Sequence, residues 1–365
     1  MKDSSRERFL AYVRARGRTR PVVSPFLPDP GVVKASLVWS GLPATDDPVQ
    51  DEIRLARALD YEPMFMTDCT GLIFPWRVDE DASDEEVEVS VIELRRGTWV
   101  RRVSRQRGLR GDSAGFPVKT LADHQMVITV CEEIGSRADE IRAYFREWRQ
   151  RIGEDGVIVI GHPHLSWLGD QISPENIFLH WRDSQETFRR SMDAIFQASL
   201  FVMEIAMAEG IDFMSESSYG LEMTSPALFE AMDMPYIQAF ADWTHRRGGL
   251  FWYHNCGQTR KLIMDNTFNR MGADLIETIA PPPDGDNDLG ESRRFIAPHI
   301  CTKGNLNLGL LHDGNPEQVA EATRRMVAAM QGYAHIFSTA DAVLPGTPPE
   351  NLVVFLQTAR QATEH

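Results

Sequence analysis

Two hydrophobic patterns alternate along the second half of the chain. Residues 157–160 are an uninterrupted apolar run ending at Gly161, as is typical of a parallel strand buried on both faces. Similar runs predict further strands at residues 211–214, 250–253, 273–277, 300–306 and 335–338. Helical spacing, or a capping residue followed by proline, predicts helices at residues 188–209, 225–247 with a break at Pro235, 260–271, 315–330 and 350–363. This order favours a parallel sheet with helical crossovers, and both a closed (β/α)8 barrel and an open doubly wound sheet fit it.

The first part of the chain has a different pattern. Val87, Val89 and Val91 alternate with polar residues before a turn at residues 95–97, which predicts a β-hairpin at residues 87–103. Six arginines lie within the first twenty residues. We predict that they form a solvated helix face, with an anion-binding arm as the alternative.

Composition narrows the class of protein. The chain has 365 residues, 42% of them hydrophobic and 25% charged, which disfavours a disordered or fibrous protein. Its net charge of −15 argues against nucleic-acid and membrane-surface binding, because both need basic surface. No apolar run reaches about 18 residues, and residues 194–208 predict a buried amphipathic helix. Four widely spaced cysteines and no apolar leader at the N-terminus predict a cytoplasmic protein.

Polar residues lie at or just after many of the predicted strands. In either architecture these positions meet at the end of the sheet where ligands bind. The candidates are Asp68, His162, His164, Glu216, His254, Cys256, Glu277, Lys303, Asn305 and Asp341.

The sharpest of these candidates is the pair His254 and Cys256. Two positions apart on a strand, their side chains point to the same face, and imidazole and thiolate are both good zinc ligands. Glu277 and Asp341 end later strands and could supply carboxylate oxygens. Buried packing without a metal is the competing interpretation of this pair.

The other candidates have structural alternatives. His162 and His164 flank a proline and are predicted to bind substrate or to be loop residues. Lys303 and Asn305 are predicted to hold an anionic group of the substrate, with a surface turn as the alternative. The segment 281–286, Pro-Pro-Pro-Asp-Gly-Asp, is predicted to be a rigid turn, with acids that could line the mouth of the site.

Several of these motifs, in this order, resemble the uroporphyrinogen decarboxylase superfamily. The resemblance covers nearly the whole chain and rests on residues 5–10, 97–98, 117–120, 254–257, 272–277, 303–306, 314–319, 338–341 and 347–351. It implies one (β/α)8 barrel domain over residues 1–365, with an N-terminal extension and an inserted β-hairpin. It also implies an active site at the carboxyl ends of the strands.

Within that superfamily, the His-x-Cys motif is similar to the methyltransferase branch, which uses zinc or works with corrinoid proteins. The resemblance implies His254, Cys256 and Glu277 as metal ligands. That branch usually has a cysteine where this chain has Asp341, which implies a fourth ligand or a general base here. Glu216 or Asp68 is expected to shuttle a proton.

Three functions fit these observations. The first is zinc-dependent methyl transfer involving a corrinoid protein or a methylated small molecule. The second is metal-free decarboxylation of a polycarboxylate such as a porphyrinogen, with Arg18, Arg20 and Asp68 at the substrate. The third is a barrel that only binds a ligand or a corrinoid partner. A homodimer is expected from the frequency of such assemblies.

Overall fold

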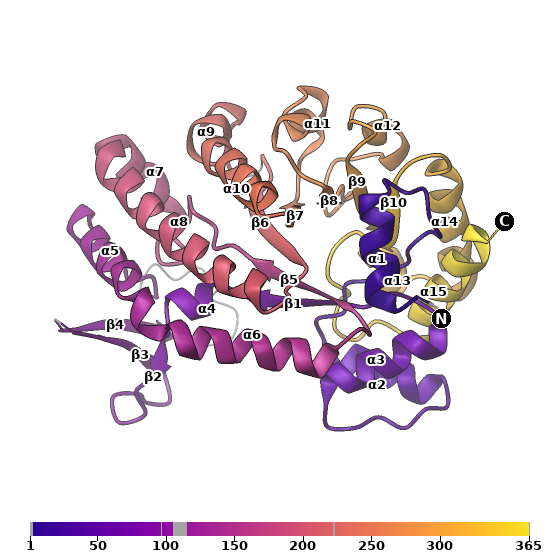
Figure 1. Ribbon diagram of the computed structural model, residues 1–365, viewed down its shortest axis with the longest axis horizontal. Helices are drawn as coiled ribbons and strands as arrows, with labels where there is room; N and C mark the ends of the chain where they lie inside the picture. Colours follow the sequence, from indigo (N-terminus) through magenta and orange to yellow (C-terminus); the bar gives the residue numbers. More distant parts are fainter. Residues whose placement is uncertain (1–2, 96, 105–114, 222, 365) are drawn as a thin grey trace. The chain divides into compact units, whose positions relative to one another are not determined.

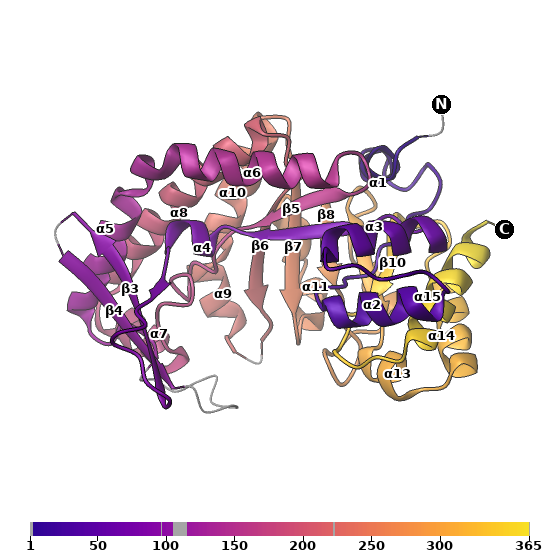
Figure 2. The same ribbon diagram turned by 90° about the horizontal axis from the view of Figure 1, so that it is seen from below.

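The computed structural model describes residues 3–95, 97–104, 115–221 and 223–364 (Figures 1 and 2). Its contacts divide the chain into two compact units. The first unit comprises Met1–Met66, Glu147–Val159 and Ile211–His365, and the second comprises Thr67–Arg146 and Ile160–Gly210.

Seven strands form one sheet, in which neighbouring strands follow one another in the order of the chain (Figure 1). Strands β6 to β10 lie wholly within the first unit. The seven strands are β1 (Met64–Asp68), β5 (Val157–Gly161), β6 (Phe213–Tyr219), β7 (Leu250–Cys256), β8 (Leu275–Thr278), β9 (Cys301–Leu306) and β10 (His335–Thr339). The adjacent pairs from β6 to β10 are parallel, as predicted.

A short extended segment at residues 22–24 supplies the remaining position in the sheet. Val23 forms a parallel bridge with Phe337 in β10. On the other side, the Val23 carbonyl oxygen accepts a hydrogen bond from the Glu62 N–H, just before β1, at 2.9 Å. This segment therefore joins the last strand to the first, and the fold is the predicted (β/α)8 barrel rather than an open sheet.

The five helices predicted in the second half of the chain are present, two of them with a different break or end, and several further helices were not predicted. The helices are α1 (Ser5–Arg14), α2 (Pro30–Trp39), α3 (Pro48–Leu59), α4 (Thr70–Ile73), α5 (His124–Glu132), α6 (Ala138–Ile152), α7 (Pro174–Asp183), α8 (Gln185–Ala208), α9 (Pro226–Met232), α10 (Met234–Arg246), α11 (Arg260–Met264), α12 (Leu289–Arg293), α13 (Leu308–Asp313), α14 (Pro316–Ala329) and α15 (Pro349–Thr363), with 3-10 turns at Leu121–Asp123, Ile134–Arg137 and Phe268–Arg270. The break predicted at Pro235 falls instead at Asp233, because a proline is tolerated in the first turn of α10. The helix predicted at residues 260–271 ends at Met264, and Asn266 leaves helical geometry with φ of 65°.

Large apolar side chains from the strands form a core inside the barrel in the first unit. The cluster includes Phe213, Trp252, Leu275 and Ile336. Phe9 of α1 stacks on Trp252 with ring centroids 6.2 Å apart and meets Phe213 edge-on at 5.6 Å. Helix α1 thus packs against the apolar core of the barrel in the first unit.

The second unit contains a separate antiparallel sheet of β2 (Arg77–Val78), β3 (Val87–Leu94) and β4 (Gly97–Ser104). Strands β3 and β4 pair with Val91 opposite Val100, which confirms the predicted hairpin; Arg96, in its turn, lies outside the described residues. Helix α8 of this unit confirms the helix predicted at residues 188–209. By length and composition alone it could cross a membrane, and 56% of its apolar 18-residue window is buried in the structure.

Candidate functional site

Strand register places four polar side chains in one layer of the barrel interior. Ser217 of β6 is paired with His254 of β7, His254 with Glu277 of β8, and Glu277 with Lys303 of β9. Neighbours in register point to the same face of a sheet, and two positions earlier on β7 Trp252 belongs to the apolar core. The polar layer therefore lies directly above the apolar layer, toward the carboxyl ends of the strands.

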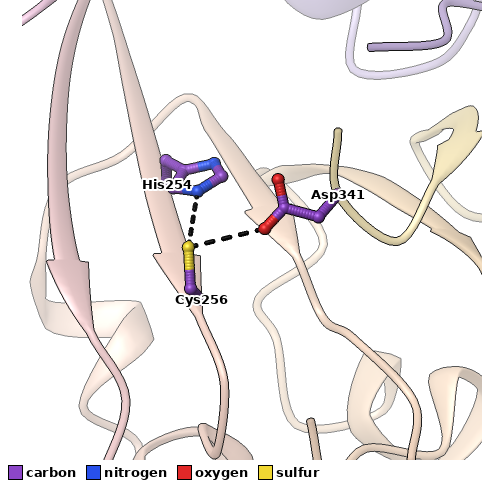
Figure 3. A group of neighbouring side chains, drawn as sticks. All are labelled: His254, Cys256 and Asp341. Carbon is purple, nitrogen blue, oxygen red and sulfur yellow. Dashed lines mark hydrogen bonds between the residues drawn. The ribbon is translucent and has the colours of Figure 1, made fainter. Parts of the chain in front are cut away.

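Three possible metal ligands meet at this end of the barrel (Figure 3). The Nε2 atom of His254 lies 2.9 Å from the Sγ atom of Cys256, and that sulfur lies 3.5 Å from Oδ2 of Asp341. One ligand atom from each of the three residues falls within 4.8 Å of the others. Asp341 reaches the cluster because it stands two residues after the end of β10, where the Ala342 N–H donates to its other carboxylate oxygen.

Glu277 holds the opposite side of the His254 ring. Its Oε2 atom lies 3.3 Å from Nδ1 of His254 and accepts a hydrogen bond from the indole N–H of Trp252 at 3.1 Å. Its Oε1 atom accepts from the ammonium group of Lys303, which also lies 5.4 Å from the centre of the Trp252 ring. Glu277 and Lys303 are both fully buried, so these contacts fix the imidazole with Nε2 toward Cys256.

The charges of this cluster shift two pKa values. Burial alone raises the pKa of Glu277, but the positive charge of Lys303 and the hydrogen bonds from His254 and Lys303 bring it down to about 2. Burial lowers the pKa of His254, but Cys256 and Glu277 outweigh it and raise that pKa well above its usual range. The carboxylate of Glu277 and the ring of His254 therefore favour each other's charged forms.

The donor set fits a zinc ion. It offers one imidazole nitrogen, one thiolate sulfur and one carboxylate oxygen, and a catalytic zinc site has three protein ligands and one open position. A carboxylate on the second ring nitrogen is the usual partner of a zinc-bound histidine. Both carboxylate oxygens of Glu277 have protein partners here. Its predicted role as a direct metal ligand stays a prediction.

The predicted substrate residues Lys303 and Asn305 both lie on β9. The ammonium group of Lys303 is fully buried against Glu277, beneath the cluster. Asn305 is 8% exposed, and its side-chain N–H donates to the Ile279 carbonyl oxygen at 2.9 Å. Their substrate contacts stay predictions, while their observed contacts support Glu277 and the turn after β8.

Of the remaining candidates, one lies on the other face of its strand and three belong to the second unit. Glu216 is paired with Tyr253, so strand alternation places it on the face opposite His254. Asp68 belongs to the second unit and accepts hydrogen bonds from the N–H groups of Thr70 and Gly71 at the start of α4. His162 and His164 also belong to that unit, where Nδ1 of His162 lies 2.7 Å from the Pro163 carbonyl oxygen. Their predicted roles stay predictions.

The loop at residues 281–286 packs beside the end of β7. Gly285 bridges Gly257, and a Cβ atom at Gly285 would lie only 2.7 Å from the Gly257 carbonyl oxygen. Oδ1 of Asp286 accepts from the N–H groups of Thr259 and Arg260 at the start of α11. The pKa of Asp284 is raised by burial and then by the negative charge of Asp341. The loop therefore lies beside the metal-ligand cluster, where its acids were expected to line the mouth of the site.

Trp252 and the pairing of Lys303 with Glu277 were missed by the sequence argument. Strand alternation could have identified Trp252, because it stands two positions before His254 and so points to the same face of β7. The register between strands, which the sequence does not give, is needed to see that Lys303 is level with Glu277.

Three of the N-terminal arginines are held by carboxylates. Arg6 pairs with Asp212 and Glu154, Arg8 with Glu62, and Arg20 with Asp60. Arg20 also precedes the segment at residues 22–24, which runs parallel to β10, so it lies at the end of the strands opposite His254.

Comparisons with known proteins identify the family and support the fold. A sequence profile of the uroporphyrinogen decarboxylase (URO-D) family matches residues 171–362, more than half of the chain. Uroporphyrinogen decarboxylases of Prochlorococcus marinus (strain MIT 9303) and Synechococcus sp. (strain CC9605) are 29% and 27% identical over 139 and 143 residues. These alignments cover 37% and 38% of this chain, and the same shares of the two relatives.

A solved structure extends the likeness to the whole chain. The methyltransferase from Methanosarcina mazei matches with a TM-score of 0.66 and 15% identity, covering 100% of both chains. At that identity the likeness concerns the fold. Together with the profile match, it confirms the resemblance inferred from the sequence motifs: the chain belongs to the uroporphyrinogen decarboxylase family.

Proposed function

We propose that this protein is a zinc-dependent methyltransferase whose second partner is a corrinoid protein or a methylated small molecule. The observation that carries the proposal is the convergence of His254, Cys256 and Asp341 at the carboxyl end of the barrel. The family and the fold shared with a methyltransferase support it.

His254, Cys256 and Asp341 would hold the ion. Bound there, zinc would supply Lewis-acid chemistry, lowering the pKa of a thiol or polarising an ether oxygen. Glu277 holds Nδ1 of His254, so the lone pair of Nε2 is directed to the cluster once that nitrogen has lost its proton. Lys303 and Trp252 keep Glu277 in place.

Asp341 distinguishes this centre from one with a second thiolate. A carboxylate is a harder ligand than a thiolate and donates less charge to the metal. We therefore propose Asp341 as the third ligand, with the fourth position left to the substrate. Asp341→Cys is expected to bind zinc more tightly than the wild type, and Asp341→Asn more weakly.

Metal-free decarboxylation is the second candidate, because the curated relatives named above are uroporphyrinogen decarboxylases. A polycarboxylate substrate needs cations at the carboxyl end of the barrel. Arg20 lies at the opposite end, Lys303 is neutralised by Glu277, and residues 25–33 after the first extended segment contain no lysine or arginine. These observations count against a polycarboxylate substrate.

A methyl-transfer assay tests the proposal. Zinc-loaded protein would be mixed anaerobically with methylcobalamin and a panel of thiols. A thiolate sulfur would bond to the methyl carbon, while the cobalt–carbon bond breaks and leaves its electron pair on cobalt. We expect turnover that is lost on chelation and in Cys256→Ala and is retained in the control Cys131→Ala, whose buried thiol lies in the second unit.

Turnover that persists after chelation and in Cys256→Ala would contradict the proposal. Carbon dioxide release from a polycarboxylate, unaffected by chelation, would support the decarboxylase instead.

A further inference from the structure

A cavity of about 260 Å³ lies within the first unit, beside β1 and helices α2 and α3. Its walls are largely apolar, with the aromatic rings of Phe26, Phe65 and Trp148 and side chains of Met64 and Met66. Exposed prolines on its lining connect it to the surface. The volume is slightly below the range of about 300–1,000 Å³ for drug-sized ligands, so a matching ligand is small.

One acidic side chain, Glu52 of α3, lines this cavity. It is 7% exposed, and among the described residues its Oε1 atom is buried without a hydrogen-bond partner. The nearby Tyr61 hydroxyl donates to the backbone carbonyl oxygen of Glu52 rather than to its carboxyl group. A buried carboxyl group without a partner is costly, which indicates that something absent from the protein alone completes it.

The walls indicate the charge of that missing partner. No lysine, arginine or histidine lines the cavity, and Glu52 forms no ion pair with the described residues. Burial raises the pKa of Glu52 well above its usual range, because a charged carboxylate is costly there without a counter-ion. A bound cation would allow it to ionise, and the faces of aromatic rings attract cations as well.

We propose that this cavity binds a small organic cation, an ammonium group with apolar substituents, with Glu52 as its counter-ion. Phe26, Met64 and Met66 also contact the apolar core that contains Trp252, and the Phe26 ring centre lies 6.0 Å from Nζ of Lys303. None of the residues that line the cavity belongs to the metal-ligand cluster. The proposal therefore stands independently of the methyl-transfer function.

Calorimetric titration with two ligands of the same shape tests the proposal. Choline carries a quaternary ammonium group, and 3,3-dimethylbutan-1-ol has a neutral carbon in its place. We expect wild-type protein to bind choline at least tenfold more tightly than the alcohol. Glu52→Gln should remove this preference, whereas Glu317→Gln, which removes an exposed acid on α14, should keep it.

Three results would overturn the assignment: equal binding of both ligands by wild-type protein, an unchanged preference in Glu52→Gln, or binding of neither at millimolar concentration. The comparison on wild-type protein needs no variant and so holds even if Glu52→Gln folds poorly. Cys256→Ala should bind choline normally, which separates this test from that of the metal centre.

Discussion

At the scale of single residues, Glu277 connects the candidate metal centre to the buried residues Lys303 and Trp252. It neutralises the buried ammonium group of Lys303 and at the same time holds His254 through Nδ1. A buried acid with both duties couples the stability of the barrel to the orientation of a metal ligand.

Replacing Glu277 by glutamine is predicted to affect both properties. Loss of the carboxylate should lower zinc affinity by about 10- to 100-fold, because the imidazole is no longer held by a charged acceptor. The free energy of unfolding should fall by about 3–5 kcal/mol, because Lys303 is left buried without a counter-ion. Competition with a coloured chelator and urea unfolding measure the two effects.

The double variant Glu277→Gln/Lys303→Met separates them. Removing both charges should restore most of the stability but not the zinc affinity. Wild-type zinc affinity in Glu277→Gln would show that Glu277 does not position His254.

The sequence indicated the members of this site better than their arrangement. His254, Cys256 and Asp341 could be named because each stands at a strand end. Lys303 was expected at the substrate, yet it is buried under the cluster, since sequence alone shows neither the depth of a side chain in a barrel nor its register with Glu277.

At the scale of elements, regular strands and helix starts were predictable and helix ends were less so. Ser225 and Asn315 cap α9 and α14 as the capping residues before proline predicted. The helix expected to reach residue 271 ends at Met264 because local turns take over, which hydrophobic spacing cannot reveal. The segment at residues 22–24 escaped prediction because it is too short to show alternation.

His335, at the start of β10, predicts acid sensitivity of the barrel. Its ring lies 2.8 Å from the Thr302 hydroxyl and 2.9 Å from the Gly304 carbonyl oxygen, and burial lowers its pKa to about 3. Between pH 3 and 6.5 the unfolded chain binds a proton here that the folded chain does not, so stability falls as pH falls. The loss from pH 7 to pH 5 should be about 2 kcal/mol for this group.

Urea unfolding of wild type and His335→Gln at both pH values, with a chelator present, measures this contribution. The variant should lose about 2 kcal/mol less than the wild type over that interval. His299→Gln, which replaces an exposed histidine, should lose as much stability between pH 7 and pH 5 as the wild type. An equal loss in His335→Gln would contradict the prediction.

At the scale of the whole molecule, the two ends of the chain meet at one buried acid in the first unit. Glu62, just before β1, accepts from Arg8 of α1 at 2.9 Å and from Arg360 of α15 at 2.7 Å. It also accepts from the Val23 N–H in the segment that closes the barrel. The single domain expected over residues 1–365 stays a prediction.

Arg360→Met is predicted to lower the free energy of unfolding by about 3 kcal/mol, because it removes one partner of a buried ion pair. Arg325→Met, which removes an exposed pair with Glu321 on α14, should cost about 0.5 kcal/mol. Chemical unfolding of both variants gives the comparison, and equal losses would mean that the contact between the chain ends contributes little.

His254, Cys256 and Asp341 are expected to hold a metal ion. Mass spectrometry of metal content in untagged wild type, Cys256→Ala and Cys131→Ala tests this assignment. We expect about one zinc per chain in wild type and Cys131→Ala and almost none in Cys256→Ala. Wild-type protein without stoichiometric metal after incubation with zinc, or equal metal in Cys256→Ala, would contradict it.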